Sequence, residues 1–170
     1  MPDMLPRIGI IGCGAIGSYV AAAIDSKKIP CEVSAVFDIL PEAAAELSTS
    51  LSSKPPVLPM EELIGKSDIV LEAAGGGAVD SVVRSCVAAG KVLLLVSTGG
   101  LKHEHIDLFK CAENGAELHV VSGAIAGVDG ILAFAKGDIE SITHITRKPP
   151  KGLAGAPYLE KNAINTKDIS

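Results

Sequence analysis

A glycine-rich stretch near the start of the chain has the residue types and the spacing that bind a phosphate-containing ligand. "GIIGCGAIGSY" places Gly12, Gly14 and Gly17 in a G-x-G-x-x-G pattern, after a predicted strand and at the start of a predicted helix. Asp38 ends the next predicted strand, 21 residues after Gly17. In this setting Gly12 permits a tight turn, Gly14 lets a pyrophosphate approach the backbone, and Gly17 lets the helix pack closely on the sheet. The stretch therefore predicts a dinucleotide site.

The same region indicates which dinucleotide would bind. We expect the N–H groups near Ala15 and Ile16 to face the phosphates at the positive end of the helix. We expect Asp38 to accept hydrogen bonds from the adenosine ribose hydroxyls, and a carboxylate there repels a 2′-phosphate. The following residues, "ILPEAA", include no Arg or Lys to receive such a phosphate. The sequence favours NAD, with NADP possible; the ligand-free alternative for Asp38 is capping of the second helix.

Two further strand ends are rich in small residues. "EAAG" contains Ala73 and Ala74, and "STGG" contains Ser97, Thr98 and Gly99. In parallel sheets of this kind ligands bind at the carboxyl ends of the strands, so both stretches should lie beside the first glycine loop. Small residues there would leave room for a cofactor. The alternative is that they pack against helices.

The elements that must position these residues alternate along the chain. Strands are predicted at residues 7–12, 31–38, 67–75, 91–100 and 116–124. Helices are predicted between them, at residues 15–26, 41–51, 60–65, 79–90 and 104–115. This order indicates a parallel sheet with right-handed crossovers, and hence an α/β fold with a Rossmann-type doubly wound sheet.

The pattern changes near Gly137. Residues 138–150 alternate apolar and polar side chains, as a strand exposed on one face would. We therefore predict a dinucleotide-binding Rossmann domain at residues 1–137 and the beginning of a second, α+β domain at residues 138–170. Arg147, Lys148 and Lys151 form a basic patch that either attracts a carboxylate substrate or is a solvated strand end.

Composition argues against several classes of partner. The net charge of −5 disfavours nucleic acid. Wholly apolar runs such as Val92–Val96 are far too short to span a membrane, and the first residues lack a signal-peptide pattern. The four cysteines have no zinc or C-x-x-C spacing, which is typical of reduced thiols in a cytoplasmic protein.

Two histidines in "KHEHID", His103 and His105, are of a type that binds metals. At a helix start their side chains diverge by about 200°, because successive residues are about 100° apart. No Cys or acidic residue has zinc-like spacing to them. We therefore predict a solvated helix start and no metal site.

Taken in order, these stretches resemble the L-aspartate dehydrogenase family. The resemblance rests on "GIIGCGAIG", "LEAAG", "LLLVSTGGL" and, most specifically, "SGAIAGVDG" followed by "ITRKPP". It runs from about Arg7 to Lys151. It implies an enzyme that oxidatively deaminates L-aspartate with a nicotinamide cofactor, giving iminosuccinate, which hydrolyses to oxaloacetate or enters NAD biosynthesis. It also implies a homodimer when full length.

The resemblance implies positions for the cofactor as well. The adenosine and pyrophosphate half would be held by Gly12, Gly14, Ala15, Ile16 and Asp38, beside the tightly packed Gly17. The groove would be lined by Ala73, Ala74 and Ser97 to Gly99. Ser122, Gly123 and Ala124 would lie against the nicotinamide ring, where hydride transfer needs the two carbons about 3–3.5 Å apart.

The chain departs from the family in two ways. The family's second domain carries a catalytic histidine and much of the aspartate pocket, and the chain stops at Ser170, soon after that domain would begin. None of its four histidines falls at the catalytic position, so the catalytic residues are unassigned and we expect the chain alone to be inactive. "EAAGGGAV" is also less polar than the family pattern. Two alternatives stay open: a related dehydrogenase, such as homoserine dehydrogenase or dihydrodipicolinate reductase, and a non-catalytic NAD-binding module.

Overall fold

A computed structural model describes residues 5–122 without a break, and residues 128, 131–132, 135–143, 145, 147, 149, 153 and 156–165. The chain divides into two compact units, residues 1–123 and 124–170. Residues 124–137 thus group with the second unit, and the domain boundary that the sequence places near Gly137 remains a prediction. Within the described residues, no helix is long and apolar enough to cross a membrane.

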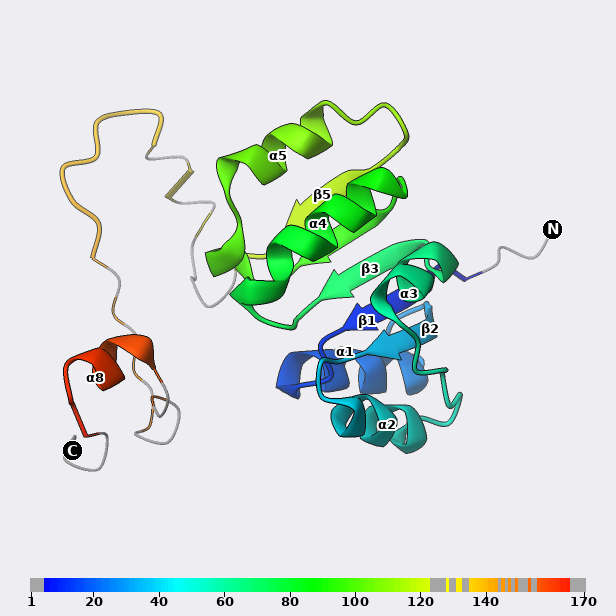
Figure 1. Ribbon diagram of the computed structural model, residues 1–170. Coiled ribbons are helices and arrows are strands. Elements are labelled where there is room, and N and C mark those ends of the chain that lie inside the picture. The colour runs from blue at the N-terminus through cyan, green and yellow to red at the C-terminus, as the bar shows by residue number, and fades with distance from the viewer. Residues whose placement is uncertain are drawn as a thin grey trace. The chain divides into compact units, whose positions relative to one another are not determined.

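The first unit is a five-stranded parallel sheet with helices between its strands (Figure 1). The strands are β1 (Arg7–Ile11), β2 (Glu32–Phe37), β3 (Ile69–Glu72), β4 (Val92–Leu95) and β5 (Glu117–Val120), in the sheet order β2-β1-β3-β4-β5. The helices are α1 (Ala15–Asp25), α2 (Pro41–Ser50), α3 (Met60–Lys66), α4 (Val79–Ala88) and α5 (His103–Lys110), with short 3-10 turns η1 (Gly76–Ala78) and η2 (Thr98–Gly100). The second unit contains α8 (Pro157–Lys161). The predicted α/β fold with a doubly wound parallel sheet is confirmed.

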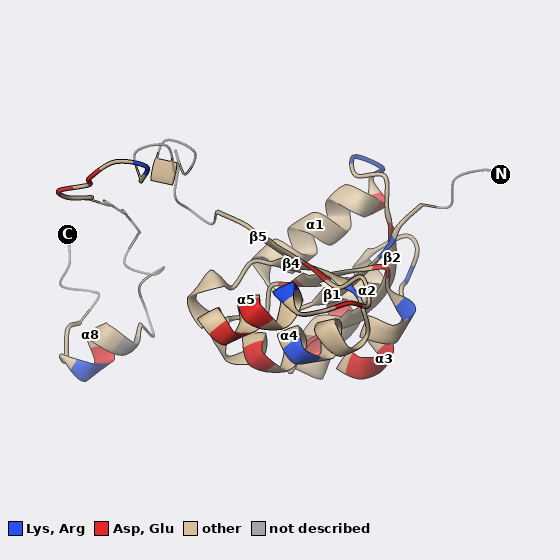
Figure 2. Ribbon diagram, turned by 90° about the horizontal axis from the view of Figure 1, so that it is seen from above, with Lys and Arg blue, Asp and Glu red and all other residues tan. Residues whose placement is uncertain are grey.

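The helices cover both faces of the sheet. α1 and α2 pack on one face, and α3, α4 and α5 pack on the other (Figures 1 and 2). Successive residues of a strand point to opposite faces, so Ile10 packs with the first group and Ile11 with the second. The core is largely aliphatic, as expected for a parallel sheet buried on both sides.

The turn from β1 into α1 is built on two glycines. Gly12 has a φ of +99°, which L side chains rarely adopt, and an added Cβ atom would lie 2.5 Å from the backbone of Ala73. An added Cβ atom on Gly17 would overlap the carbonyl oxygen of Gly12 and lie 3.2 Å from the Ile10 side chain. The tight turn and the close helix packing predicted for these glycines are both present.

Several predicted elements differ from the structure. The strands predicted to end at residues 75, 100 and 124 end at Glu72, Leu95 and Val120, and residues 98–100 form η2. α5 ends at Lys110, and the chain beyond it lets the Asn114 amide donate to the Val87 carbonyl of α4 at 2.7 Å.

The strand predicted at residues 138–150 is wrong for those of its residues that are described, which belong to no helix or strand. Ile142 and Ile145 are 61% and 78% exposed, so the alternating pattern does not mark a buried face there.

We expect Gly17→Ala to lower the free energy of unfolding by about 1–3 kcal/mol, because the added methyl group has no space beside Gly12. Gly14→Ala is the matched control, since its Cβ atom meets nothing within 4 Å. It should cost at most about 1 kcal/mol, through the weaker preference for alanine at a helix N-cap. Urea unfolding followed by circular dichroism measures both variants. Equal stabilities would contradict the packing role of Gly17.

Candidate cofactor site

The predicted site lies at the carboxyl edge of the sheet, between β1 and β3. The chain runs from β1 outward to β2 and then returns to β3 on the other side of β1, so the strand order reverses there. Open α/β sheets bind their ligands in the crevice outside such a point. Gly12 packs on the backbone of Ala73 and donates its N–H to the Phe37 carbonyl at 2.8 Å. The ends of β1, β2 and β3 therefore meet at one place.

The start of α1 fits a pyrophosphate. Gly14 is the N-cap residue, and no side chain caps the helix. Gly14, Ala15 and Ile16 are exposed, and the space beside the Gly14 Cα atom is open. The first N–H groups of a helix have no partner within it and carry its positive dipole end. A dinucleotide's phosphates can therefore approach this backbone closely.

Asp38 joins the glycine loop to the end of β2. Its Oδ2 atom accepts from the Cys13 N–H at 2.7 Å, and its Oδ1 atom accepts from the Leu40 N–H at 2.9 Å. The helix-cap alternative is not observed, because α2 begins after Leu40 without a side-chain cap. A carboxylate can accept about four hydrogen bonds, so Asp38 keeps acceptor capacity for the ribose hydroxyls of an adenosine.

The thiol beneath this loop is unsuited to nucleophilic chemistry. Burial, and after it the nearby charge of Asp38, raises the pKa of Cys13 to about 11. Cys13 therefore stays a neutral thiol that fills space. All four cysteines are free, consistent with the reduced thiols predicted from their spacing.

A cavity of about 570 Å³ adjoins Asp38. It is lined by the ends of β1 and β2, by the start of α3, and by the segment from Ala74 to Ser81. Ile39 and Met60 contribute apolar surface to it, and the Asp38 carboxylate stands in its wall. Glu61 and Ser81 also line it, so the cavity combines apolar surface with a few polar groups, which suits an adenine ring and its ribose.

Glu72 is a functional candidate that the sequence reasoning missed. It is fully buried at the end of β3. Its Oε1 atom accepts from the Ala74 N–H at 2.8 Å, and its Oε2 atom accepts from the Ser97 N–H at 3.0 Å. The Ser97 hydroxyl in turn accepts from the Gly75 N–H at 2.9 Å. An acidic residue within the apolar stretch "IVLEAA" is the signal that could have revealed it.

The loops after β3 and β4 are packed as one unit. A Cβ atom on Gly100 would overlap the Gly76 carbonyl oxygen, so the two backbones touch directly. The predicted groove residues lie on these loops: Ala73, Ala74 and Ser97 at the strand ends, and Thr98 and Gly99 exposed in η2. Ser122 is exposed after β5, and Gly123 and Ala124 lie outside the described residues. Of the basic patch, Lys148 and Lys151 also lie outside them.

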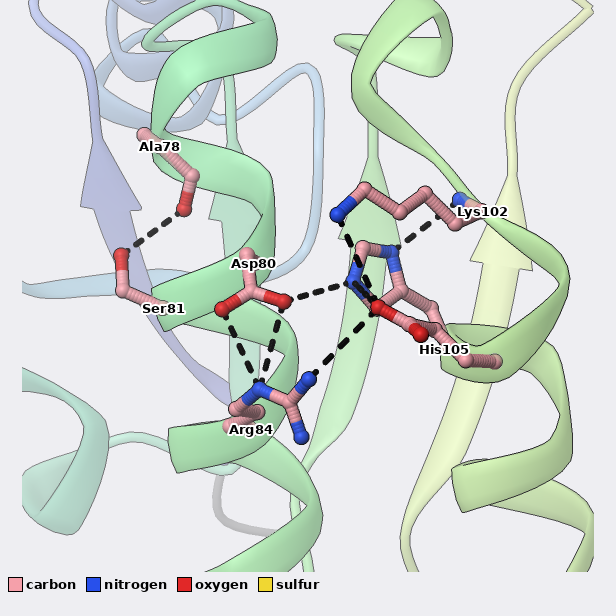
Figure 3. Close-up of polar contacts among 7 residues, drawn as sticks. Ala78, Asp80, Ser81, Arg84, Lys102 and His105 are labelled. Carbon is pink, nitrogen blue, oxygen red and sulfur yellow. Dashed lines mark hydrogen bonds and ion pairs between the residues drawn. The ribbon is translucent and has the colours of Figure 1, made fainter.

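The prediction of a solvated helix start is wrong for His105. Its side chain is fully buried, whereas His103 is exposed. His105 Nε2 lies 2.9 Å from Oδ1 of Asp80 on α4, and its Nδ1 atom accepts from the Lys102 N–H at 3.1 Å (Figure 3). This burial could not be predicted from the local pattern, because Asp80 is 25 residues away along the chain.

Asp80, Glu104 and His105 lie close enough to suggest a metal site, but their hydrogen bonds oppose it. One ligand atom from each lies within 4.8 Å of the others. A metal on His105 Nε2 would require the ring proton on Nδ1, where it would face the Lys102 N–H. Arg84 already pairs with Asp80 at 3.1 Å and with Glu104 at 3.7 Å. The hydrogen bonds to Arg84 and His105 lower the pKa of Asp80 to about 2.

We expect Glu72→Gln to destabilise the chain by about 1–3 kcal/mol. The amide NH₂ would face a backbone N–H, of Ala74 or of Ser97, and leave buried donors unsatisfied. Glu113→Gln is the control, because it removes the same charge at an exposed position. Urea unfolding measures both. A Glu72→Gln variant as stable as the control would contradict the bridging role of this carboxylate.

The chain matches known proteins over most of its length. The family model described as "Homoserine dehydrogenase, NAD binding domain" matches residues 12–120. L-aspartate dehydrogenase from Methanosarcina barkeri is 40% identical over 96% of the chain, and that from Methanocella arvoryzae is 38% identical over 94%. These alignments cover 62% and 60% of the two relatives, so the chain spans about three-fifths of their length.

Solved structures show the same fold. Myo-inositol dehydrogenase from Lactobacillus casei, in complex with NAD(H) and myo-inositol, matches 78% of the chain and 42% of that protein, with a TM-score of 0.64 at 22% identity. WlbA dehydrogenase from Bordetella pertussis, in complex with NADH and UDP-GlcNAcA, matches the same shares with a TM-score of 0.61 at 20% identity. The match to this NAD-binding domain confirms the predicted cofactor class, a nicotinamide adenine dinucleotide. The chain belongs to the dehydrogenase family of this NAD-binding domain, and over nearly its whole length it is related to the L-aspartate dehydrogenases.

Proposed function

We propose that this chain is the cofactor-binding part of an L-aspartate dehydrogenase, which oxidises L-aspartate to iminosuccinate, whose hydrolysis releases ammonia and oxaloacetate. The observation that carries the proposal is the strand-order reversal between β1 and β3, because the uncapped start of α1 follows the end of β1 and the cavity beside Asp38 is lined by the ends of β1 and β2. The substrate is inferred from the relatives, which are 38–40% identical and are named L-aspartate dehydrogenase. Homoserine dehydrogenase shares the family model, but these relatives favour aspartate.

The described residues bind and orient the cofactor in this proposal. When bound, the dinucleotide accepts a hydride from the α-carbon of the amino acid. The N–H groups of Ala15 and Ile16 bind the pyrophosphate, and Asp38 accepts from the adenosine ribose. The loops after β3 and β4 bear small side chains, so the dinucleotide can lie against backbone that Glu72 and Ser97 hold in place. Ser122, Gly123 and Ala124 would then face the nicotinamide ring.

The oligomeric state and the cellular location are inferred from the sequence. We infer a homodimer for the complete enzyme from the resemblance to the family. The prediction of a cytoplasmic protein rests on the four free cysteines and remains a prediction. A role in NAD biosynthesis follows from the product iminosuccinate.

We expect the 170-residue chain to bind NADH without oxidising L-aspartate on its own. Titration of NADH fluorescence tests binding, and NADH production from NAD and L-aspartate tests turnover. Gly14→Ala should bind NADH at least about tenfold more weakly, because its methyl group would stand where the pyrophosphate approaches, a loss of about 1.4 kcal/mol. Failure of the unaltered chain to bind at millimolar NADH would refute the proposed cofactor site.

We expect a preference for NADH over NADPH that depends on Asp38. Asp38→Asn should lower the ratio of the NADPH and NADH dissociation constants by about tenfold, since like charges about 4 Å apart cost on the order of 1–4 kcal/mol. The ratio is the useful readout, because any loosening of the glycine loop affects both cofactors. Asp25→Asn, at the far end of α1, is the control. An unchanged ratio would show that Asp38 does not select the cofactor.

A further inference from the structure

His105 occupies an unusual position at the start of α5. It is fully buried, although its neighbours Lys102, His103 and Glu104 are exposed. Its ring makes two hydrogen bonds, one through each nitrogen, to Lys102 and Asp80 (Figure 3). Because Nδ1 accepts a backbone N–H, the neutral ring carries its proton on Nε2 and donates it to the Asp80 carboxylate.

The bond to Lys102 fixes the end of a cofactor-site loop. Lys102 is the N-cap residue of α5 and follows η2 by two residues. The His105 N–H donates to the Lys102 carbonyl at 3.1 Å, while the His105 ring accepts from the Lys102 N–H at 3.1 Å. This reciprocal pair has the form of a capping box, with histidine in the place usually taken by Glu or Gln.

The other end of the same loop is held by different groups. The Ser97 N–H donates to Glu72, and the Ser97 hydroxyl accepts from the Gly75 N–H. Between the two ends, Gly100 packs directly on Gly76. Contacts therefore hold the segment from Ser97 to Lys102 at both ends and in the middle. The hydrogen bond from Lys102 to His105 is the contact at the end that leads into α5.

Asp80 anchors the histidine ring. The Asp80 carboxylate also binds the Arg84 side chain, which lies one turn further along α4. With its pKa lowered to about 2, Asp80 remains an acceptor at any ordinary pH. The bond to Asp80 on α4 thus fixes the orientation of the ring, so that Nδ1 points toward the Lys102 N–H.

We propose that His105 is a positioning residue of the dinucleotide site. Through the Lys102 N–H it holds the Ser97–Lys102 segment in the conformation that binds the cofactor, and so it sets the affinity for NADH. This inference rests on the proposed cofactor site. It assigns the effect to one atom, the Nδ1 acceptor, and not to the bulk of the buried ring.

Two substitutions separate the acceptor from the bulk of the ring. Asn carries its amide oxygen two bonds from Cβ, as His carries Nδ1, so His105→Asn can still accept from Lys102 but does not reach Asp80. Leu has nearly the shape of Asn but carries no polar side-chain atom, so His105→Leu loses the acceptor for the Lys102 N–H and, like His105→Asn, does not bond to Asp80. The two variants therefore differ in the acceptor and not in side-chain bulk.

We expect NADH fluorescence titration to give His105→Asn an affinity within about threefold of the unaltered chain. His105→Leu should bind about three- to tenfold more weakly, the range that one hydrogen bond supplies. His103→Asn, at the exposed neighbouring histidine, is the control and should bind as the unaltered chain does. Urea unfolding of each variant shows whether affinity follows stability instead.

Three results would overturn the inference. Equal affinity of the two His105 variants, or weaker binding by His105→Asn than by His105→Leu, would show that the acceptor does not matter. Long-range ¹H–¹⁵N NMR of the unaltered chain needs no substitution, and a proton on His105 Nδ1 would exclude the bond to Lys102. If the unaltered chain itself failed to bind NADH, the proposed cofactor site would fall and this inference with it.

Discussion

The buried carboxylate of Glu72 is the interaction on which the cofactor edge of the sheet depends. An isolated charge inside a protein is very costly, and it is tolerated only where hydrogen bonds replace those of water. Glu72 meets this condition with backbone N–H groups on two different loops, after β3 and after β4. The need to satisfy one charge therefore brings two loops together, and each loop places its small residues along the same crevice.

Side chains that accept hydrogen bonds from loop backbone recur along this edge of the sheet. Asp38 accepts hydrogen bonds from the glycine loop and from Leu40 at the start of α2, and His105 accepts one from the N–H group at the start of α5. In each case a side chain with two acceptor or donor atoms ties a loop to a neighbouring element. A binding surface that is ordered before its ligand arrives loses less conformational entropy on binding. None of these side chains caps the helix start at Gly14, which is where a phosphate has to fit.

The dinucleotide loop could be predicted because its chemistry is local. Gly12, Gly14 and Gly17 act within one turn, and the position of Asp38 follows from the length of a single β-α-β unit. Glu72 and His105 could not be found in this way, since their partners Ser97 and Asp80 are each 25 residues distant. His105 was misjudged for the same reason. A residue at a helix start looks solvated until the neighbouring helix that covers it is known.

The sequence by itself determined the order of strands and helices, the parallel sheet and the glycine loop, because periodicity and glycine spacing follow from short-range backbone geometry. It also determined that an acid would stand at the end of β2. Only the tertiary structure decided where α5 ends, that Glu72 joins two strand ends, and that His105 is buried against Asp80. Those outcomes depend on which elements become neighbours in the sheet order β2-β1-β3-β4-β5, and on the hydrogen bonds that buried polar groups must then find.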